Sequence, residues 1–144
     1  MIAIDTNILV YAHREDAPWH DAAVDAVRRV AEGRAAWCIP WPCIHEFLAI
    51  VTHPRIFKTP TPLNAALDQI EAWLESPSVV VIGESEGYWQ QLRDVLKAGR
   101  IAGALVHDAR VAALCAHHGV SMLWTADRDF GRFPSLKSTN PLVG

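Results

Sequence analysis

The stretch MIAIDTNILV (residues 1–10) decides the fold, because a short apolar run rich in isoleucine surrounds a single Asp-Thr-Asn. Short runs of β-branched residues are typical of a strand that is buried on both faces of a parallel sheet. We therefore predict a strand in this stretch and place Asp5 near its end. A polar residue there lies at the edge of the sheet where open parallel α/β proteins bind their ligands.

The rest of the chain alternates between helical and strand patterns. Apolar residues recur every three or four positions in several segments, and glycine follows some of them as a stop signal. Thr61 and Pro62 predict an N-cap and a first helical position. The predicted helices cover residues 19–32, 43–52, 63–74, 88–99 and 102–118, and the further strands cover 36–39, 79–82 and 122–124, with 136–138 as an edge strand.

This alternation predicts a three-layer α/β/α sandwich with a mostly parallel central sheet. The length of 144 residues is near the usual size of one domain, so we expect residues 1–144 to form a single domain. Right-handed crossovers place the carboxyl ends of the strands at one edge of the sheet. An active site is expected in the crevice outside those ends.

The composition excludes several classes of protein. The chain is 51% hydrophobic and 20% charged with a net charge of −3, which argues against disorder and against binding of nucleic acid by bulk positive charge. The cysteines, Cys38, Cys43 and Cys115, lack C-x-x-C spacing and lie among apolar residues, so we expect them to be reduced core residues. No leader or long apolar segment is recognisable, which predicts a soluble, cytoplasmic protein.

Five acidic residues are expected at or near the carboxyl edge of the sheet. Asp5 follows the first strand, and Asp127 and Asp129 follow the last convincing strand. Glu46 lies in an apolar helical segment, and Asp108 lies on the helix face that should pack on the sheet. Carboxylates in such places are costly to bury unless they are paired or bind a metal. Their convergence raises their pKa values unless a cation neutralises them.

The chemistry of these side chains favours Mg²⁺ or Mn²⁺. Both ions suit oxygen ligands, whereas zinc would require clusters of cysteine or histidine. His117 and His118 are adjacent and point about 100° apart on a helix, so they do not easily share a metal. We interpret His107, beside Asp108, as a surface residue. Two divalent ions about 3.5–4 Å apart can activate water for phosphodiester cleavage, so a nuclease is the natural reaction class.

Four acidic parts of the sequence follow one another along the chain: Asp5-Thr6-Asn7, the isolated Glu46, the mid-helix Asp108 and the segment TADRDF (residues 125–130). Together they resemble the acidic motifs of the PIN-domain nucleases. The resemblance covers essentially the whole chain, whose length and spacing are similar to those of the VapC toxins of bacterial toxin–antitoxin pairs. It implies roles for the acids and for the polar side chains beside them. The implied catalytic residues are Asp5, Glu46, Asp108 and Asp127, the implied metal ligands are Asp5, Asp108, Asp127 and Asp129, and the implied supports are Thr6, Asn7 and Thr125.

The resemblance also implies an activity and partners. We expect a Mg²⁺- or Mn²⁺-dependent endoribonuclease that cleaves structured RNA such as tRNA or rRNA. A small VapB-like antitoxin is expected to silence it by covering the acidic site with a C-terminal segment. The resemblance implies a homodimer as well, with helix faces that contain Trp73 or Trp89 as candidate contact surfaces. Asp129 either binds the metal or only orders its loop.

Positive charge for the RNA backbone is expected from a few side chains, since the net charge does not supply it. Trp41, between two prolines, is a candidate for stacking on a base. The candidate phosphate ligands are Arg14, Arg55, Arg110 and Arg128, with Lys58 and Arg132 as further possibilities.

Two other functions fit part of the pattern. An aspartyl-phosphate phosphatase also places an aspartate after the first strand of an α/β sheet. Such enzymes normally present a second aspartate two positions later, where this chain has Asn7. A non-catalytic partner module that keeps its metal site only for binding is the other alternative, and it predicts metal binding without turnover.

Overall fold

The computed structural model describes residues 1–143 and contains a five-stranded sheet with the strand order β3-β2-β1-β4-β5. Every pair of neighbouring strands is parallel. The interior strands are apolar because helices cover both faces of the sheet, and Ala3, Ile4 and Leu123 are fully buried. The strands are β1 (Ile2–Ile4), β2 (Trp37–Pro40), β3 (Val79–Ile82), β4 (Met122–Trp124) and β5 (Ser138–Thr139).

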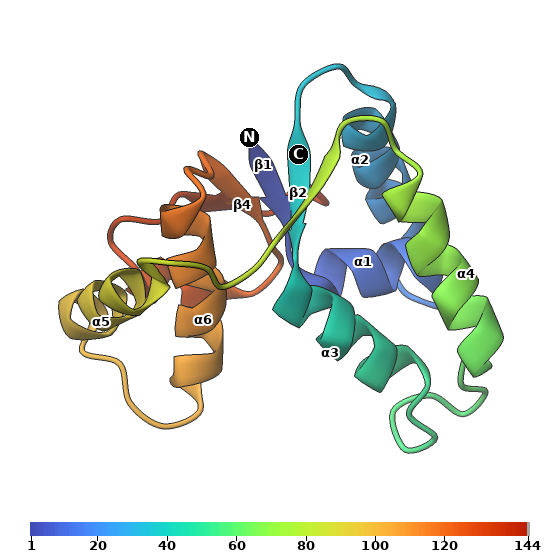
Figure 1. The fold of residues 1–144 in the computed structure, drawn as a ribbon. Coiled ribbons are helices and arrows are strands. Elements are labelled where there is room, and N and C mark those ends of the chain that lie inside the picture. The colour runs from blue at the N-terminus through green and yellow to red at the C-terminus, as the bar shows by residue number, and fades with distance from the viewer. Residues whose placement is uncertain (144) are drawn as a thin grey trace.

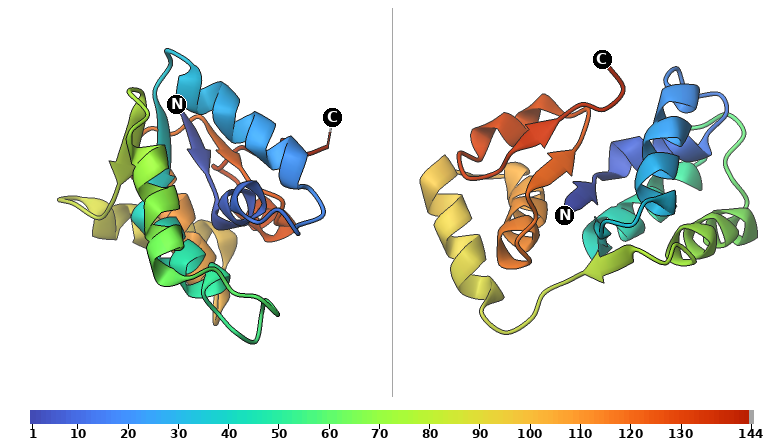
Figure 2. Two further views of the ribbon diagram at one scale, coloured as in Figure 1. Left: turned by 90° about the vertical axis from the view of Figure 1, so that its right-hand side faces the viewer. Right: turned by 90° about the horizontal axis from the view of Figure 1, so that it is seen from above.

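Within residues 1–143, six α-helices and the 3₁₀ helix η1 connect the strands. They are α1 (Thr6–His13), α2 (His20–Glu32), α3 (Trp41–Val51), α4 (Leu63–Leu74), α5 (Tyr88–Gly99), α6 (Leu105–His117) and η1 (Arg128–Arg132). None of the helices in this part of the chain is long and apolar enough to cross a membrane. Figures 1 and 2 show α5 and α6 on one side of the sheet and α1 to α4 on the other. The predicted three-layer α/β/α sandwich with a parallel sheet is confirmed.

The sheet reverses its direction of winding between β1 and β4. From β1 the chain moves outward through β2 to β3, and it then crosses back to β4 on the other side of β1. Right-handed crossovers put the connecting helices of these two directions on opposite faces. A crevice therefore opens at the carboxyl ends of β1 and β4, where Asp5 and Thr125 follow their strands.

The strand predicted in residues 1–10 is present as β1, and Asp5 follows its end as predicted, but α1, which the sequence analysis did not assign, begins directly after Asp5. Asp5 is the N-cap of α1, and its Oδ1 accepts a hydrogen bond of 2.8 Å from the backbone N–H of Thr6. Ile8 is fully buried, since α1 packs against α2 and α3. An apolar run of this length fits a buried helix as well as a strand, so the pattern located the strand before Asp5 but did not reveal the helix after it.

Several other boundaries differ from their predictions by one to three residues, among them that of α3, which was predicted over 43–52 and covers Trp41–Val51. The helix predicted over 102–118 begins at Leu105, because Gly103 adopts a positive φ of 66° that a right-handed helix does not contain. The edge strand predicted over 136–138 lies at 138–139. None of these changes moves a predicted site acid away from the carboxyl edge of the sheet.

The loop between α3 and α4 is attached to the end of α1. Thr61 is not an N-cap, contrary to the prediction. Its buried side chain instead contacts His13 Nε2 at 3.0 Å and accepts a hydrogen bond of 3.2 Å from Arg14. Helix α4 covers Leu63–Leu74 as predicted, but Pro62 is its N-cap and not its first helical residue.

Helix α4 has one wide apolar face, and only part of it is buried. Trp73 is only 8% exposed and packs edge-on against Phe47, with ring centroids 5.1 Å apart. The suggestion that Trp73 marks a contact surface is therefore wrong, because the core already covers that side chain. Leu63, Leu67 and Leu74 lie at the adjoining part of this face and are exposed.

The cysteines behave as core residues. Cys38, Cys43 and Cys115 are free and buried, as predicted. Burial raises the pKa of Cys38 to about 12 and raises the pKa of Cys115 as well. Neutral thiols of this kind are poor metal ligands and poor nucleophiles.

Candidate active site

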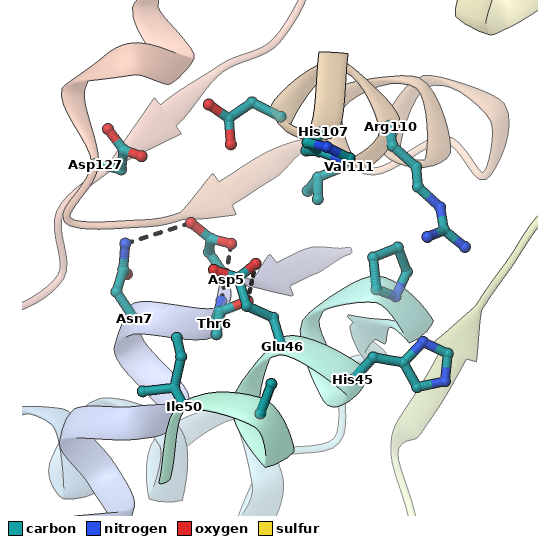
Figure 3. A pocket seen from close by; sticks show the side chains of 13 residues that line it. Asp5, Thr6, Asn7, His45, Glu46, Ile50, His107, Arg110, Val111 and Asp127 are labelled. Atoms are coloured by element: carbon teal, nitrogen blue, oxygen red, sulfur yellow. Dashed lines mark hydrogen bonds between the residues drawn. The ribbon is translucent and has the colours of Figure 1, made fainter. Parts of the chain in front are cut away.

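A pocket of about 540 Å³ lies between α3 and α6, in the crevice at the carboxyl ends of β1 and β4 (Figure 3). On each helix the lining residues are spaced so that they share one face, and both faces turn toward the pocket. All four acids predicted to be catalytic line it. The lining residues are Asp5, Thr6, Asn7, Pro42, His45, Glu46, Ala49, Ile50, His107, Asp108, Arg110, Val111 and Asp127.

Asp5 is the buried acid of the pocket, with 7% of its surface exposed. Beside its capping bond to Thr6, its Oδ2 accepts a hydrogen bond of 2.7 Å from the Thr125 hydroxyl. The thiol of Cys43 donates to its Oδ1 across 3.6 Å. Burial raises the pKa of Asp5, and the hydrogen bond from Thr125 opposes that rise. The carboxylate is thus held in one orientation by α1, α3 and the end of β4.

Asn7 and Thr125 connect the two segments that follow β1 and β4. The Asn7 amide donates to Thr125 Oγ1 at 3.2 Å and to Asp5 Oδ2 at 3.4 Å, and its Oδ1 accepts from the Ala126 N–H at 3.1 Å. Thr125 Oγ1 also accepts a hydrogen bond of 3.0 Å from the Asp127 N–H. These bonds place Asn7 and Thr125 beside Asp5 and join the segments that follow β1 and β4.

Asp108, Asp127 and Asp129 form a second acidic group. One carboxylate oxygen from each lies within 4.8 Å of the others. Asp127 is the N-cap of η1, and its Oδ1 accepts a hydrogen bond of 2.9 Å from the Asp129 N–H. The Asp127 side chain therefore orders this loop through the Asp129 backbone, and the Asp129 carboxylate lies beside the other two.

Burial, and after it repulsion between carboxylates, raises the pKa values of the acids in the pocket. Burial and four neighbouring carboxylates, first of all Asp127, raise the pKa of Asp108 from 3.8 to about 6. Burial and the charge of Asp5 raise the pKa of Glu46, although a hydrogen bond of 3.4 Å from the Thr6 hydroxyl lowers it. No arginine or lysine in residues 1–143 forms an ion pair with these acids. Glu46 is accordingly not the partner of an arginine.

The residues present fit a hard divalent cation. The three clustered aspartates offer only oxygen ligands, which Mg²⁺ and Mn²⁺ prefer. Their excess negative charge has no cationic counterpart among the ion pairs in the described part of the chain, so a bound cation would relieve the repulsion. Cysteine does not join this cluster, and the carboxylate set does not resemble a zinc site.

The predicted phosphate ligands separate into two groups. Arg14 does not line the pocket and is engaged elsewhere, in an ion pair of 2.6 Å with Asp16. Arg55 lies in the exposed loop after α3, also outside the pocket lining. Arg110 lines the pocket directly, and Arg128 is exposed immediately after a site acid. Only Arg110 and Arg128 therefore lie beside the acids.

Sequence reasoning gave too little weight to three residues. His45 and His107 line the pocket, and the charge of His107 lowers the pKa of Glu46. Each histidine directly precedes a predicted catalytic acid, and that adjacency was the available signal. Cys43 was expected in apolar surroundings, yet its thiol contacts Asp5. Nothing in the sequence indicated that contact.

Comparison with known proteins relates the whole chain to one family. The family model described as "PIN domain" matches residues 2–136 of this chain. Ribonuclease VapC48 of Mycobacterium tuberculosis is 34% identical to this chain, over 97% of this chain and 97% of its own length. VapC ribonuclease Mb2897 of Mycobacterium bovis is 31% identical, over 100% of this chain and 97% of its own length.

Solved structures show the same fold. VapBC2 from Rickettsia felis, bound to a DNA fragment from its promoter, matches with a TM-score of 0.67 and 22% identity, over 97% of this chain and 98% of the matched chain. VapC20 of Mycobacterium tuberculosis, a sarcin–ricin loop cleaving toxin, matches with a TM-score of 0.65 and 18% identity, over 91% of this chain and 93% of the matched chain. At these identities the likeness concerns the fold.

Proposed function

The chain belongs to the PIN-domain family, and from that premise we propose that it is a Mg²⁺- or Mn²⁺-dependent endoribonuclease. The observation that carries the proposal is the convergence of Asp5, Glu46, Asp108 and Asp127 in one pocket. These acids come from four separate segments of the chain. Helix capping by Asp5 and Asp127 does not account for the grouping of all four carboxylates, which repel one another. The described residues share one sheet and one core cluster, which supports treating residues 1–144 as a single domain.

The arrangement suits hydrolysis of a phosphodiester bond. Asp108, Asp127 and Asp129 would hold the cation, with Asp5 completing the acidic site. A bound divalent ion supplies a water of lowered pKa and neutralises charge on the phosphate. Glu46, whose pKa is raised by burial, accepts the proton of the attacking water. The new bond joins the water oxygen to phosphorus, and the bond from phosphorus to O3′ breaks. The products carry a 5′-phosphate and, after O3′ gains a proton, a 3′-hydroxyl.

We assign the enzyme to the toxin side of a VapBC-type toxin–antitoxin pair acting in the cytoplasm. Relatives over nearly the whole chain are named VapC ribonucleases, and the similar folds include VapBC complexes. The substrate is structured RNA such as tRNA or rRNA, and a VapB-like antitoxin silences the enzyme by covering the acidic pocket. The low positive charge of the chain makes RNA binding salt-sensitive and dependent on a few residues such as Arg110 and Arg128.

A homodimer is part of the same proposal. Leu63, Leu67 and Leu74 are exposed on α4, and their spacing of four and seven positions aligns them along one side of the helix. Figure 1 shows α4 on the outside of the molecule, on the opposite side of the sheet from α5 and α6. A self-complementary apolar stripe suits a two-fold contact between copies. We therefore place the dimer contact on α4 in preference to Trp89, which is 64% exposed on α5.

Cleavage of total cellular RNA by purified, antitoxin-free protein tests the proposal. The reactions contain Mg²⁺, Mn²⁺ or EDTA, and the Asp5→Asn variant controls for contaminating nucleases. Discrete fragments that require the metal and disappear in the variant would support an endoribonuclease. Metal binding without cleavage of any RNA would instead support the non-catalytic module. A phosphatase would release phosphate from small phosphate esters and leave the RNA intact.

A further inference from the structure

One side of the pocket carries cationic and aromatic side chains instead of carboxylates. His45 and Arg110 line the pocket from α3 and α6, and Figure 3 shows both on the side away from Asp127. An RNA strand that places its scissile phosphate over the acids must pass next to this side. The pocket is therefore asymmetric, with hydrolytic groups at one end and groups that suit a phosphate and a base at the other.

Trp41 extends this side beyond the pocket. It is the first residue of α3 and is 44% exposed. Its ring lies 6.2 Å from that of His45 at an interplanar angle of 31°. A Cβ atom at Gly83 would come within 3.0 Å of Trp41 Cδ1, so the absence of a side chain at Gly83 lets the indole lie against the end of β3. An indole held on one side and exposed on the other provides a platform for base stacking.

Glu84 holds the guanidinium of Arg110. The Nε of Arg110 donates a hydrogen bond to Glu84 Oε1, and the two side chains are 42% and 37% exposed. Exposed pairs of this kind contribute little to folding stability. The remaining N–H groups of the guanidinium have no partner among the hydrogen bonds of residues 1–143 and are free to donate to a phosphate.

We propose that Trp41, His45 and Arg110 form a subsite for the nucleotide that adjoins the scissile bond in RNA. The indole stacks on the base, and His45 and Arg110 contact the phosphate. Glu84 is a positioning residue that orients the guanidinium. This inference rests on the proposed ribonuclease activity, and it names side chains that the acidic motifs do not include.

The stacking part is tested with an RNA oligonucleotide that spans the cut site found in total RNA. The Trp41→Ala variant should raise KM roughly 5- to 100-fold, with kcat changed much less. Trp41→Phe should restore most of the affinity, since it keeps an aromatic face. Trp19→Ala is the matched control, because Trp19 is 46% exposed and tilted against another ring, at 5.5 Å from Tyr11, but lies outside the pocket lining.

The phosphate part is tested by salt dependence. Arg110→Gln should weaken binding and reduce the slope of log affinity against log salt by about 0.7 to 0.9, the effect of one lost phosphate contact. Arg93→Gln is the matched control, because Arg93 is similarly exposed and paired with an acid, Asp94 at 3.6 Å. Glu84→Ala should raise KM several-fold, whereas Glu84→Gln keeps an acceptor for the Arg110 Nε and should restore the parent KM.

Direct binding separates failure of the subsite from failure of the enzymatic proposal. Fluorescence anisotropy of the same labelled oligonucleotide, measured in an Asp5→Asn background, requires no cleavage. Circular dichroism confirms that each variant is folded. If Trp41→Ala and Arg110→Gln bind and cleave like the parent, the subsite is refuted. If the parent protein cleaves no RNA with either metal, the proposed function itself fails.

Discussion

Replacing Asp108 with asparagine should stabilise the metal-free protein at pH 8 while it impairs cleavage. Burial and, after it, repulsion by the neighbouring carboxylates raise the pKa of Asp108 from 3.8 to about 6. The carboxylate forms no hydrogen bond or ion pair in the described residues, so asparagine removes the charge without breaking a side-chain bond. A carboxyl group whose pKa is higher in the folded state destabilises the fold once pH exceeds that value.

The magnitude follows from the difference between the two pKa values. A difference of about two pH units corresponds to roughly 3 kcal/mol at 1.36 kcal/mol per unit. Asp108 is partly exposed, and solvent screening reduces this to about 1–2 kcal/mol. For a chain of 144 residues, an increase of about 1–2 kcal/mol in the free energy of unfolding raises Tm by about 3–7 °C. The penalty is absent below pH 3.8, grows as pH rises to about 6 and is complete above that value.

Thermal unfolding in EDTA at pH 4 and pH 8 measures the effect, with Asp68→Asn on the exposed side of α4 as the matched control. We expect a higher Tm for Asp108→Asn at pH 8, little difference at pH 4 and no change for the control. Added Mg²⁺ should raise the Tm of the parent more than that of the variant, because it binds the folded site. An Asp108→Asn protein no more stable than the parent at pH 8 in EDTA would show that burial and acid repulsion do not destabilise the ionised Asp108 in the folded protein.

Three further substitutions test separate parts of the argument. Glu46→Gln should lower kcat by roughly 10²- to 10⁴-fold, and its activity should no longer fall as the pH drops through the raised pKa of Glu46. A variant with the same pH profile as the parent would exclude Glu46 as the general base. Cys115→Ala should cost about 1 kcal/mol of unfolding free energy through lost packing and leave cleavage unchanged, whereas reduced activity would reveal an unrecognised role for the thiol. Leu67→Glu should convert the dimer to a monomer in light scattering after size exclusion, and a persistent dimer would move the contact off α4.

The acids were predictable because their positions depend on topology. In a parallel sheet the carboxyl ends of the strands share one edge, so Asp5 and Asp127 could be brought together without knowledge of a single contact. Asp108 could be added because helical spacing placed it on the face turned toward the sheet. Periodicity and topology therefore sufficed for residues whose position follows from the backbone.

The cationic residues were not predictable in the same way. Arg14 and Arg55 lie in or beside loops, and sequence proximity does not fix the direction of a long side chain there. Arg14 instead binds Asp16 and the loop that precedes α4. The stacking of Trp41 beside His45 depends on the small size of Gly83, a contact between segments about forty residues apart. Such contacts are set by packing and leave no periodic signal.

The same hydrogen bonds begin the helices and position the acids. Asp5 caps α1 and Asp127 caps η1, so each carboxylate is oriented by backbone N–H groups that also start a helical segment. Thr125 links the two through its bonds to Asp5 and the Asp127 N–H, and keeps the like charges close together. The fold therefore maintains a repulsion that a divalent cation relieves. Stability without metal and affinity for metal are two measures of that repulsion, so a substitution such as Asp108→Asn should increase the first and decrease the second.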